Sequence, residues 1–176
     1  RTLHNLTPTA SACLGRTLIM TSMIGESLKG ENDKTTVIIK GDGPIGGILV
    51  TSDNKMETKG YTYNNAVDIP LKPNGKLDVS GAIGNGTLTI IKDLGLKEPY
   101  QGMINLVSGE IAEDFTYYYT KSEQTPSTIG LGVLVSKENT ISQAGGFWIS
   151  LLPGCKDEII DIIEKNNFIF WKIPFI

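Results

Sequence analysis

The stretch that decides the fold is residues 75–127, which read GKLDVSGAIGNGTLTIIKDLGLKEPYQGMINLVSGEIAEDFTYYYTKSEQTPS. Within it, residues 87–92 alternate threonines with Leu88 and Ile90, the period of a half-buried strand. Residues 100–106 follow after a turn, and we expect them to pair with that strand. The stretch therefore predicts two paired strands that lead into a helix.

The predicted helix of this stretch begins near Ser108 and ends before Pro126. Ser108 can cap its N-terminus, while Glu110 and Glu113 place negative charge near the positive end of its dipole. One face carries the apolar and aromatic residues Ile111, Phe115, Tyr118 and Tyr119. Tyr117 falls among the charged residues of the opposite face. It is either an ordinary exposed aromatic or an anchor for protein partners.

Working outward, residues 8–30 predict a second helix. Thr7 is a plausible N-cap, Pro8 suits the first helical position, and Gly30 is a natural C-terminal stop. Apolar residues lie on nearly all sides of this helix, which is typical of a buried one. We therefore expect it to lie against a sheet and to be covered by another element.

The remaining segments predict strands joined by turns. Three runs, at residues 35–40, 47–51 and 56–63, have the spacing of antiparallel hairpins, and residues 127–135 and 140–151 form a final pair. Residues 64–74 predict a loop, and a further helix starts near Asp157. The expected fold class is α+β, a mostly antiparallel sheet packed with the buried N-terminal helix and two further helices.

Two more sequence blocks add to the signature of residues 75–127: IKGDGPIGGI at residues 39–48 and AGGFWISLLPG at residues 144–154. In this order the three blocks resemble the 33 kDa heat-shock chaperone family, heat shock protein 33, over residues 7–165. The resemblance implies a redox-regulated, stress-response holdase. Such a protein binds unfolding or oxidatively damaged clients through apolar surface, uses no ATP and catalyses no reaction. A homodimer is a further expectation for this chain.

Cysteine content departs from that family. Its members carry a C-terminal module in which four cysteines, spaced as CxC and CxxC, hold zinc and form disulfides on oxidation. This chain has two distant cysteines, Cys13 and Cys155, and one histidine, His4. A structural zinc site needs four such ligands. We therefore expect no zinc or redox-switch domain and no cofactor in this chain, with zinc confined to a full-length member.

Isolated reactive groups give no stronger signal. Cys13 lies in a nearly all-apolar helix, which predicts an inert buried thiol; Cys155 is either structural or activated by a following helix. Residues 41–46 match GxGxxG, but a strand follows where a phosphate site needs a helix, so we interpret them as a turn. Nothing selects a pair of carboxylates or a catalytic triad. We expect no enzyme.

Composition excludes two partner classes. The chain has 16 basic and 19 acidic residues and a net charge of −3, which disfavours nucleic acid. The longest uncharged run, residues 139–155, contains three glycines and a proline and would span a bilayer poorly. With no closely spaced cysteine pairs, a cytoplasmic protein is expected.

The two ends raise further hypotheses. The chain starts with Arg1, and the resemblance begins in mid-motif, so residues 1–166 are expected to be a chaperone core domain that lacks an N-terminal strand region. Such a loss would leave an unpaired sheet edge. Residues 167–176 form an atypical apolar tail, which packs on the core, offers a sticky end or derives from a shifted reading frame. Candidate client-binding residues are Tyr117, Phe168, Phe170 and Trp171. The alternative function is a non-catalytic self-association module.

Overall fold

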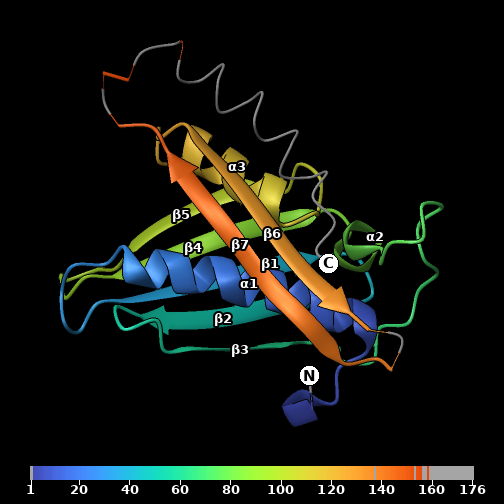
Figure 1. Cartoon of the computed structure of the whole chain (residues 1–176). Helices are drawn as coiled ribbons and strands as arrows, with labels where there is room; N and C mark the ends of the chain where they lie inside the picture. Colours follow the sequence, from blue (N-terminus) through green and yellow to red (C-terminus); the bar gives the residue numbers. More distant parts are fainter. Residues whose placement is uncertain (1, 137, 153, 156–157, 159–176) are drawn as a thin grey trace.

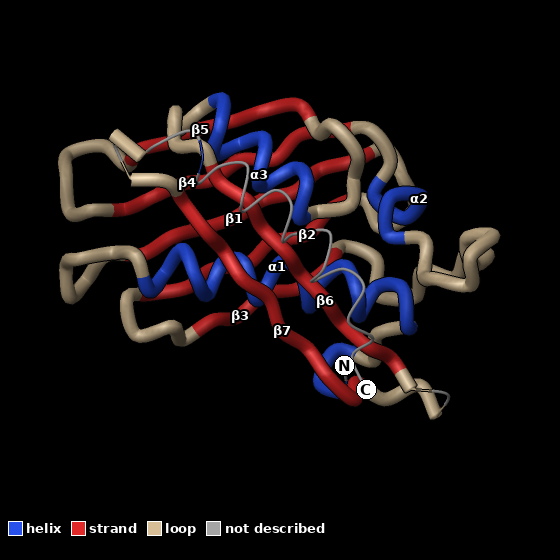
Figure 2. Tube along the Cα trace, turned by 45° about the horizontal axis from the view of Figure 1, so that its top comes forward, coloured by secondary structure: helices blue, strands red, loops and turns tan. Residues whose placement is uncertain are grey.

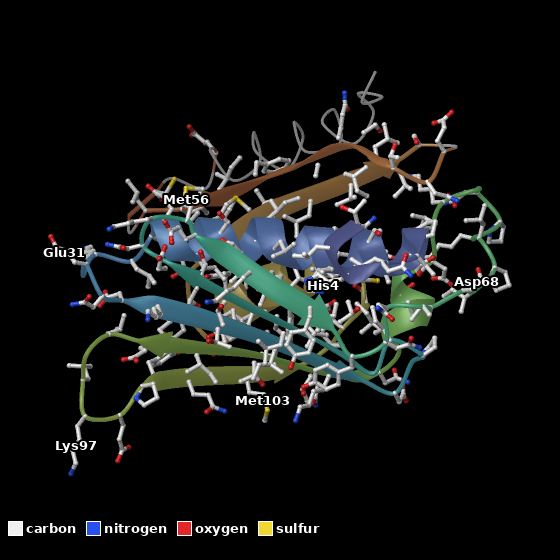
Figure 3. All side chains as sticks on the ribbon, turned by 90° about the horizontal axis from the view of Figure 1, so that it is seen from below. His4, Glu31, Met56, Asp68, Lys97 and Met103 are labelled. Atoms are coloured by element: carbon white, nitrogen blue, oxygen red, sulfur yellow. The ribbon has the colours of Figure 1, made fainter. Side chains whose placement is uncertain are left out.

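The computed structural model describes residues 2–136, 138–152, 154–155 and 158 of the chain. Three layers are stacked in it: a five-stranded sheet, the helix α1 and a two-stranded ribbon (Figures 1 and 3). The elements are η1 (Thr2–His4), α1 (Pro8–Glu26), β1 (Lys34–Gly41), β2 (Gly47–Asp53), β3 (Thr58–Thr62), α2 (Val79–Ile83), β4 (Gly86–Asp93), β5 (Tyr100–Asn105), α3 (Ala112–Lys121), β6 (Ser127–Val135) and β7 (Ile141–Ser150). The predicted α+β class is confirmed.

The large sheet has the order β3-β2-β1-β4-β5, and every neighbouring pair is antiparallel. Val37 of β1 lies opposite Val50 of β2 and Ile90 of β4, and all three side chains are fully buried. They belong to the face that packs against α1. The predicted strands, including the β4–β5 pair, lie within about two residues of the observed ones because period-two alternation is a local signal.

Helix α1 lies between the sheet and the ribbon, as its apolar character on all sides predicts. The β6–β7 ribbon crosses over it (Figure 2). The three layers approach closely at two glycines. A Cβ on Gly15 would come within 2.8 Å of the Val133 side chain in β6, and one on Gly25 would collide with the Asp53 carbonyl oxygen in β2. Small residues therefore set the spacing of the layers.

The predicted C-terminal end of α1 needs correction, whereas Thr7 occupies the N-cap position as predicted. Pro8 is the first helical residue, but the helix ends at Glu26 rather than Gly30, and the Ser27 N–H closes its last turn. Gly30 instead donates its N–H to the Asp33 carboxylate at 2.8 Å in the turn before β1. The Thr7 hydroxyl does not cap the helix, because it donates to the Val67 carbonyl at 2.6 Å.

Short helix α2 was not predicted. It spans five residues, and the Asp78 carboxylate caps it by accepting the Gly81 N–H at 2.9 Å. One and a half turns are too few to show a helical period in the sequence. The helix contributes Val79, Ala82 and Ile83 to the core.

The predicted Ser108 cap of α3 is wrong. Asp114, in the first turn, instead accepts the N–H groups of Val107, Ser108 and Ile111, which precede the helix, at 2.7, 3.0 and 3.1 Å. The Ser108 hydroxyl accepts only the Glu110 N–H. Four aromatic or apolar residues of the predicted inner face are buried as expected: Ile111, Phe115, Tyr118 and Tyr119.

Ile111 has an unusual backbone. Its φ is +67° and its ψ −60°, and the next N–H, that of Ala112, donates to the Glu110 carbonyl at 2.8 Å. These values describe a γ-turn of the rare, strained kind. A β-branched residue in such a conformation costs about 1–3 kcal/mol. The Ile111 side chain is nevertheless fully buried.

Substitutions at this residue test the strain. Both Ile111→Ala and Ile111→Gly remove the buried side chain, which destabilises by about 2–5 kcal/mol. At an ordinary position glycine is less stable than alanine by about 0.5–1 kcal/mol, but positive φ favours glycine. We expect Ile111→Gly to be more stable than Ile111→Ala by about 1 kcal/mol in urea-induced unfolding. An alanine variant that is the more stable of the two contradicts the strain.

Candidate functional site

One face of the five-stranded sheet is covered by α1, α3 and the ribbon, whereas the described residues place nothing over the other face (Figure 3). Its residues follow from strand alternation and register. A central row crosses all five strands in the order Tyr61, Leu49, Ile38, Thr89 and Met103. We call this the central row of the uncovered face. Figure 3 shows Met103 pointing away from α1.

The two ends of the central row are the most accessible. Met103 in β5 is 61% exposed and Tyr61 in β3 is 45% exposed. Tyr63, just beyond β3, is 52% exposed and stacks on Tyr61 with ring centroids 5.9 Å apart and planes at 20°. Leu49 and Ile38, between the ends, are half-buried by their neighbours. Large apolar side chains of the central row thus remain in contact with solvent on every strand except β4, which contributes Thr89.

Flanking rows are more polar. One contains Lys59, Thr51, Thr36, Ile91 and Gln101, and the other contains Tyr63, Gly47, Lys40, Thr87 and Asn105. The central row has no charged residue, and each flanking row has a single lysine. Such a surface buries apolar side chains of a partner without selecting one shape, because the hydrophobic effect is not directional.

Away from this face, a cluster of charged side chains connects α1, the loop 64–77 and the residue before α3. Glu110, just before α3, accepts from Arg16 of α1 at 3.0 Å and pairs with Lys72 of the loop 64–77. Lys72 also lies 3.6 Å from Asp78, the cap of α2. Burial acts to raise the pKa of Glu110, but hydrogen bonds and charge from Lys72 and Arg16 outweigh it and hold that pKa below its usual value.

The comparisons with known proteins agree with the fold. The family model described as Hsp33 protein matches residues 1–170. The chain belongs to the Hsp33 family. A 33 kDa chaperonin of Clostridioides difficile is 54% identical over 167 residues, which cover 94% of this chain and 57% of that protein. A 33 kDa chaperonin of Ruminiclostridium cellulolyticum is 51% identical over 164 residues, which cover 93% of this chain and 56% of the relative.

A solved structure gives the same result. The crystal structure of the Hsp33 homologue of Thermotoga maritima matches with a TM-score of 0.91 at 40% identity, covering 99% of this chain and 59% of that one. The chain therefore spans somewhat more than half the length of the Hsp33 relatives it matches. The resemblance predicted from residues 7–165 is confirmed.

The Hsp33 client-binding residues predicted from sequence divide into two groups. Tyr117 is 38% exposed on α3, which lies on the covered side of the sheet, so it does not join the uncovered face. Phe168, Phe170 and Trp171 lie outside the described residues. All four remain predictions.

Packing also bears on the other sequence interpretations. Burial raises the pKa of the Cys13 thiol to about 12, so this thiol is inert in the folded state, as predicted. Cys155 is half-buried. The turn at residues 41–46 donates the N–H groups of Asp42 and Gly43 to the carbonyls of Asn85 and Ile83. These amides are engaged within the protein, which supports the turn interpretation over a phosphate site.

Neither a metal-ligating group nor a membrane-spanning helix occurs in the described part of the chain. It contains no group of three or more His, Cys, Asp or Glu side chains close enough to share a metal ion. None of its helices combines the length and apolar character needed to cross a bilayer.

Sequence reasoning missed the uncovered face, although a signal was present. Strands β1, β2 and β4 carry aliphatic residues on both faces, as Ile38 and Ile39 do in β1. This pattern is typical of a strand buried on both sides. It also fits a strand whose second face binds a partner. The Glu110 cluster left no local signal, because Arg16 is 94 residues away in the sequence.

The Glu110 cluster predicts a measurable acid response. Because the folded-state pKa of Glu110 lies below its ordinary value of 4.5, its contribution to stability is present above about pH 4.5 and is lost as the pH falls through the folded value. We expect Glu110→Gln to have a smaller drop in Tm than the parent between about pH 5 and pH 3. Glu113→Gln, on the exposed side of α3, is the matched control. Parallel Tm curves for parent and Glu110→Gln contradict the assignment.

Proposed function

We propose that this chain acts in the cytoplasm as an ATP-independent holding chaperone, which binds unfolding proteins at the uncovered face of its sheet and prevents their aggregation. The observation that carries the proposal is the uncharged central row, with Tyr61 and Met103 exposed at its two ends. Membership in the Hsp33 family and the names of its relatives, 33 kDa chaperonins, support a chaperone.

The chemistry of such a site is association. Unfolding proteins expose apolar side chains, and each Å² of apolar surface removed from water contributes about 25 cal/mol. Flexible Met103 adapts to clients of different shape, while the Tyr61 ring offers a flat apolar surface with a polar tip. Lys40 and Lys59 beside the central row keep the face hydrated when no client is bound. No step of this activity requires a catalytic group.

Regulation by oxidation would need cysteines that this sequence does not contain. It has two, Cys13 and Cys155, and Cys13 is buried with a raised pKa. Four cysteines in close pairs are needed for a zinc switch. We infer that holding by this chain depends neither on peroxide nor on zinc, and that its partners are unfolded or oxidatively damaged proteins.

Substitution of the row ends tests the surface. The double variant Tyr61→Ser/Met103→Ser removes the most exposed apolar groups of the central row. We expect the variant to need at least about a tenfold higher concentration than the parent to suppress half of the aggregation of a chemically unfolded client. This ratio corresponds to about 1.4 kcal/mol of binding free energy. Light scattering measures the effect, and circular dichroism verifies that the variant is folded.

The matched control is Leu71→Ser/Leu96→Ser, which removes exposed leucines from the loop 64–77 and from the β4–β5 turn. We expect it to hold clients as the parent does. Equal loss in both variants would show that general surface apolarity, rather than this face, binds clients. A concentration-dependent oligomer in size-exclusion chromatography, with no suppression of aggregation, would favour the self-association module instead.

A redox comparison tests the regulation. The same aggregation assay is run in reductant and after peroxide treatment, each with and without a zinc chelator. We expect equal suppression in all four conditions, because the described residues provide no metal cluster and Cys13 is inaccessible. Suppression that appears only after oxidation contradicts the proposal.

A further inference from the structure

The two flanking rows of the uncovered face carry charge of one sign. Their charged residues are Lys59 of β3 and Lys40 of β1, and the central row between them has none. The whole chain, in contrast, has a net charge of −3. The charge beside the central row is therefore opposite in sign to that of the protein as a whole.

Neither lysine is neutralised by a side chain in the described part of the chain. Lys40 and Lys59 are both exposed. The ion pairs among the described residues use Arg16, Lys72 and Lys92 as their cations, and none of them involves the two lysines of the flanking rows. Two ammonium groups beside the central row are thus available to a partner.

Acidic residues lie beyond the three rows, where the strands end. Asp53 and Asp93 lie opposite Lys34 in the register of β1, and Asp42 follows that strand. The carboxylates of all three aspartates accept backbone N–H groups near the turns, at 2.7–3.2 Å. These carboxylates are engaged with the protein's own backbone at the margins of the face, whereas positive charge lies beside the central row.

Both lysines can reach a segment that is bound along the central row. Lys59 is two residues from Tyr61 in β3, and Lys40 is two residues from Ile38 in β1. Two residues of a strand span about 7 Å, a distance that the flexible four-carbon stem of lysine can cover. The central row crosses five strands, which at about 4.8 Å per strand matches the length of about six extended residues.

We propose that the uncovered face selects client segments in which about six apolar residues are accompanied by acidic residues, and that Lys40 and Lys59 determine this preference. The apolar residues bind along the central row, and the carboxylates pair with an ammonium group on either side of it. Segments flanked by basic residues are disfavoured, because like charges repel beside the row. This inference rests on the proposed holding function and adds the chemical class of the client segment.

Three dye-labelled peptides test the preference. Each has the same apolar core, Val-Leu-Ile-Phe-Val-Leu, flanked at both ends by two glutamates, two lysines or two serines. We expect the parent to bind the glutamate peptide at least about threefold more tightly than the lysine peptide at low salt, because exposed ion pairs contribute little each. Fluorescence anisotropy measures both affinities. Selection by the net charge of −3 predicts the reverse order, so the order of the two peptides is decisive.

A pair of variants with equal net charge assigns the preference to the two lysines. Lys40→Gln/Lys59→Gln removes both ammonium groups beside the central row. The control, Lys76→Gln/Lys97→Gln, removes exposed lysines from the loop 64–77 and from the β4–β5 turn (Figure 3). We expect the preference for the glutamate peptide to disappear in the first variant and to remain in the second, and high salt to weaken it in the parent. A preference that survives in Lys40→Gln/Lys59→Gln, or that falls equally in both variants, overturns the inference.

The serine peptide separates this inference from the proposed function, because it binds through its apolar core alone. Suppose that it binds the parent and is released by Tyr61→Ser/Met103→Ser, while the glutamate and lysine peptides bind with equal affinity. The holding face then stands, and the charge preference is overturned. A parent that binds none of the three peptides contradicts the holding function and the inference together.

Discussion

Burial of α1 on both sides is the constraint on which the other features depend. The helix can be apolar on nearly all faces only because the sheet covers one side and the β6–β7 ribbon the other. Two of its buried hydroxyls are satisfied within the helix: Thr17 donates to the Cys13 carbonyl at 2.9 Å and Thr21 to the Thr17 carbonyl at 2.7 Å. Glycines at the crossing points permit the close approach.

This layer order also explains the uncovered face. In the described residues, the helices and the ribbon lie on one side of the sheet. The other side therefore exposes threonines, Ile38 and Leu49, together with Tyr61 and Met103 at the ends of the central row. A hydrophilic sheet face would normally be expected here. The retention of aliphatic and aromatic side chains on this face is the feature on which the proposed client binding rests.

Local patterns predicted much of the fold, and distant contacts account for the errors. Alternation located the strands, and the apolar surface of residues 8–30 predicted a helix between two layers. The end of α1 was misplaced because Gly30 bonds to Asp33 in a turn instead of ending the helix. The cap of α3 was misplaced because Asp114, rather than Ser108, accepts the N–H groups at this position. The family resemblance predicted a client-binding protein, but no local rule reveals which sheet face stays open, and the role of Tyr117 remains a prediction.

An exposed apolar sheet face can cause copies of the chain to associate, and the residues around the central row limit this association. Exposed apolar surface and open sheet edges favour association between copies, yet threonines alternate with the aliphatic residues, and Lys40 and Lys59 flank the central row. Charge on both sides opposes stacking of two identical faces, because each lysine would lose hydration on burial. An unfolded client, in contrast, can place its apolar segments along the central row and leave the lysines in water. The same arrangement thus disfavours face-to-face stacking of two copies and is compatible with the proposed client binding.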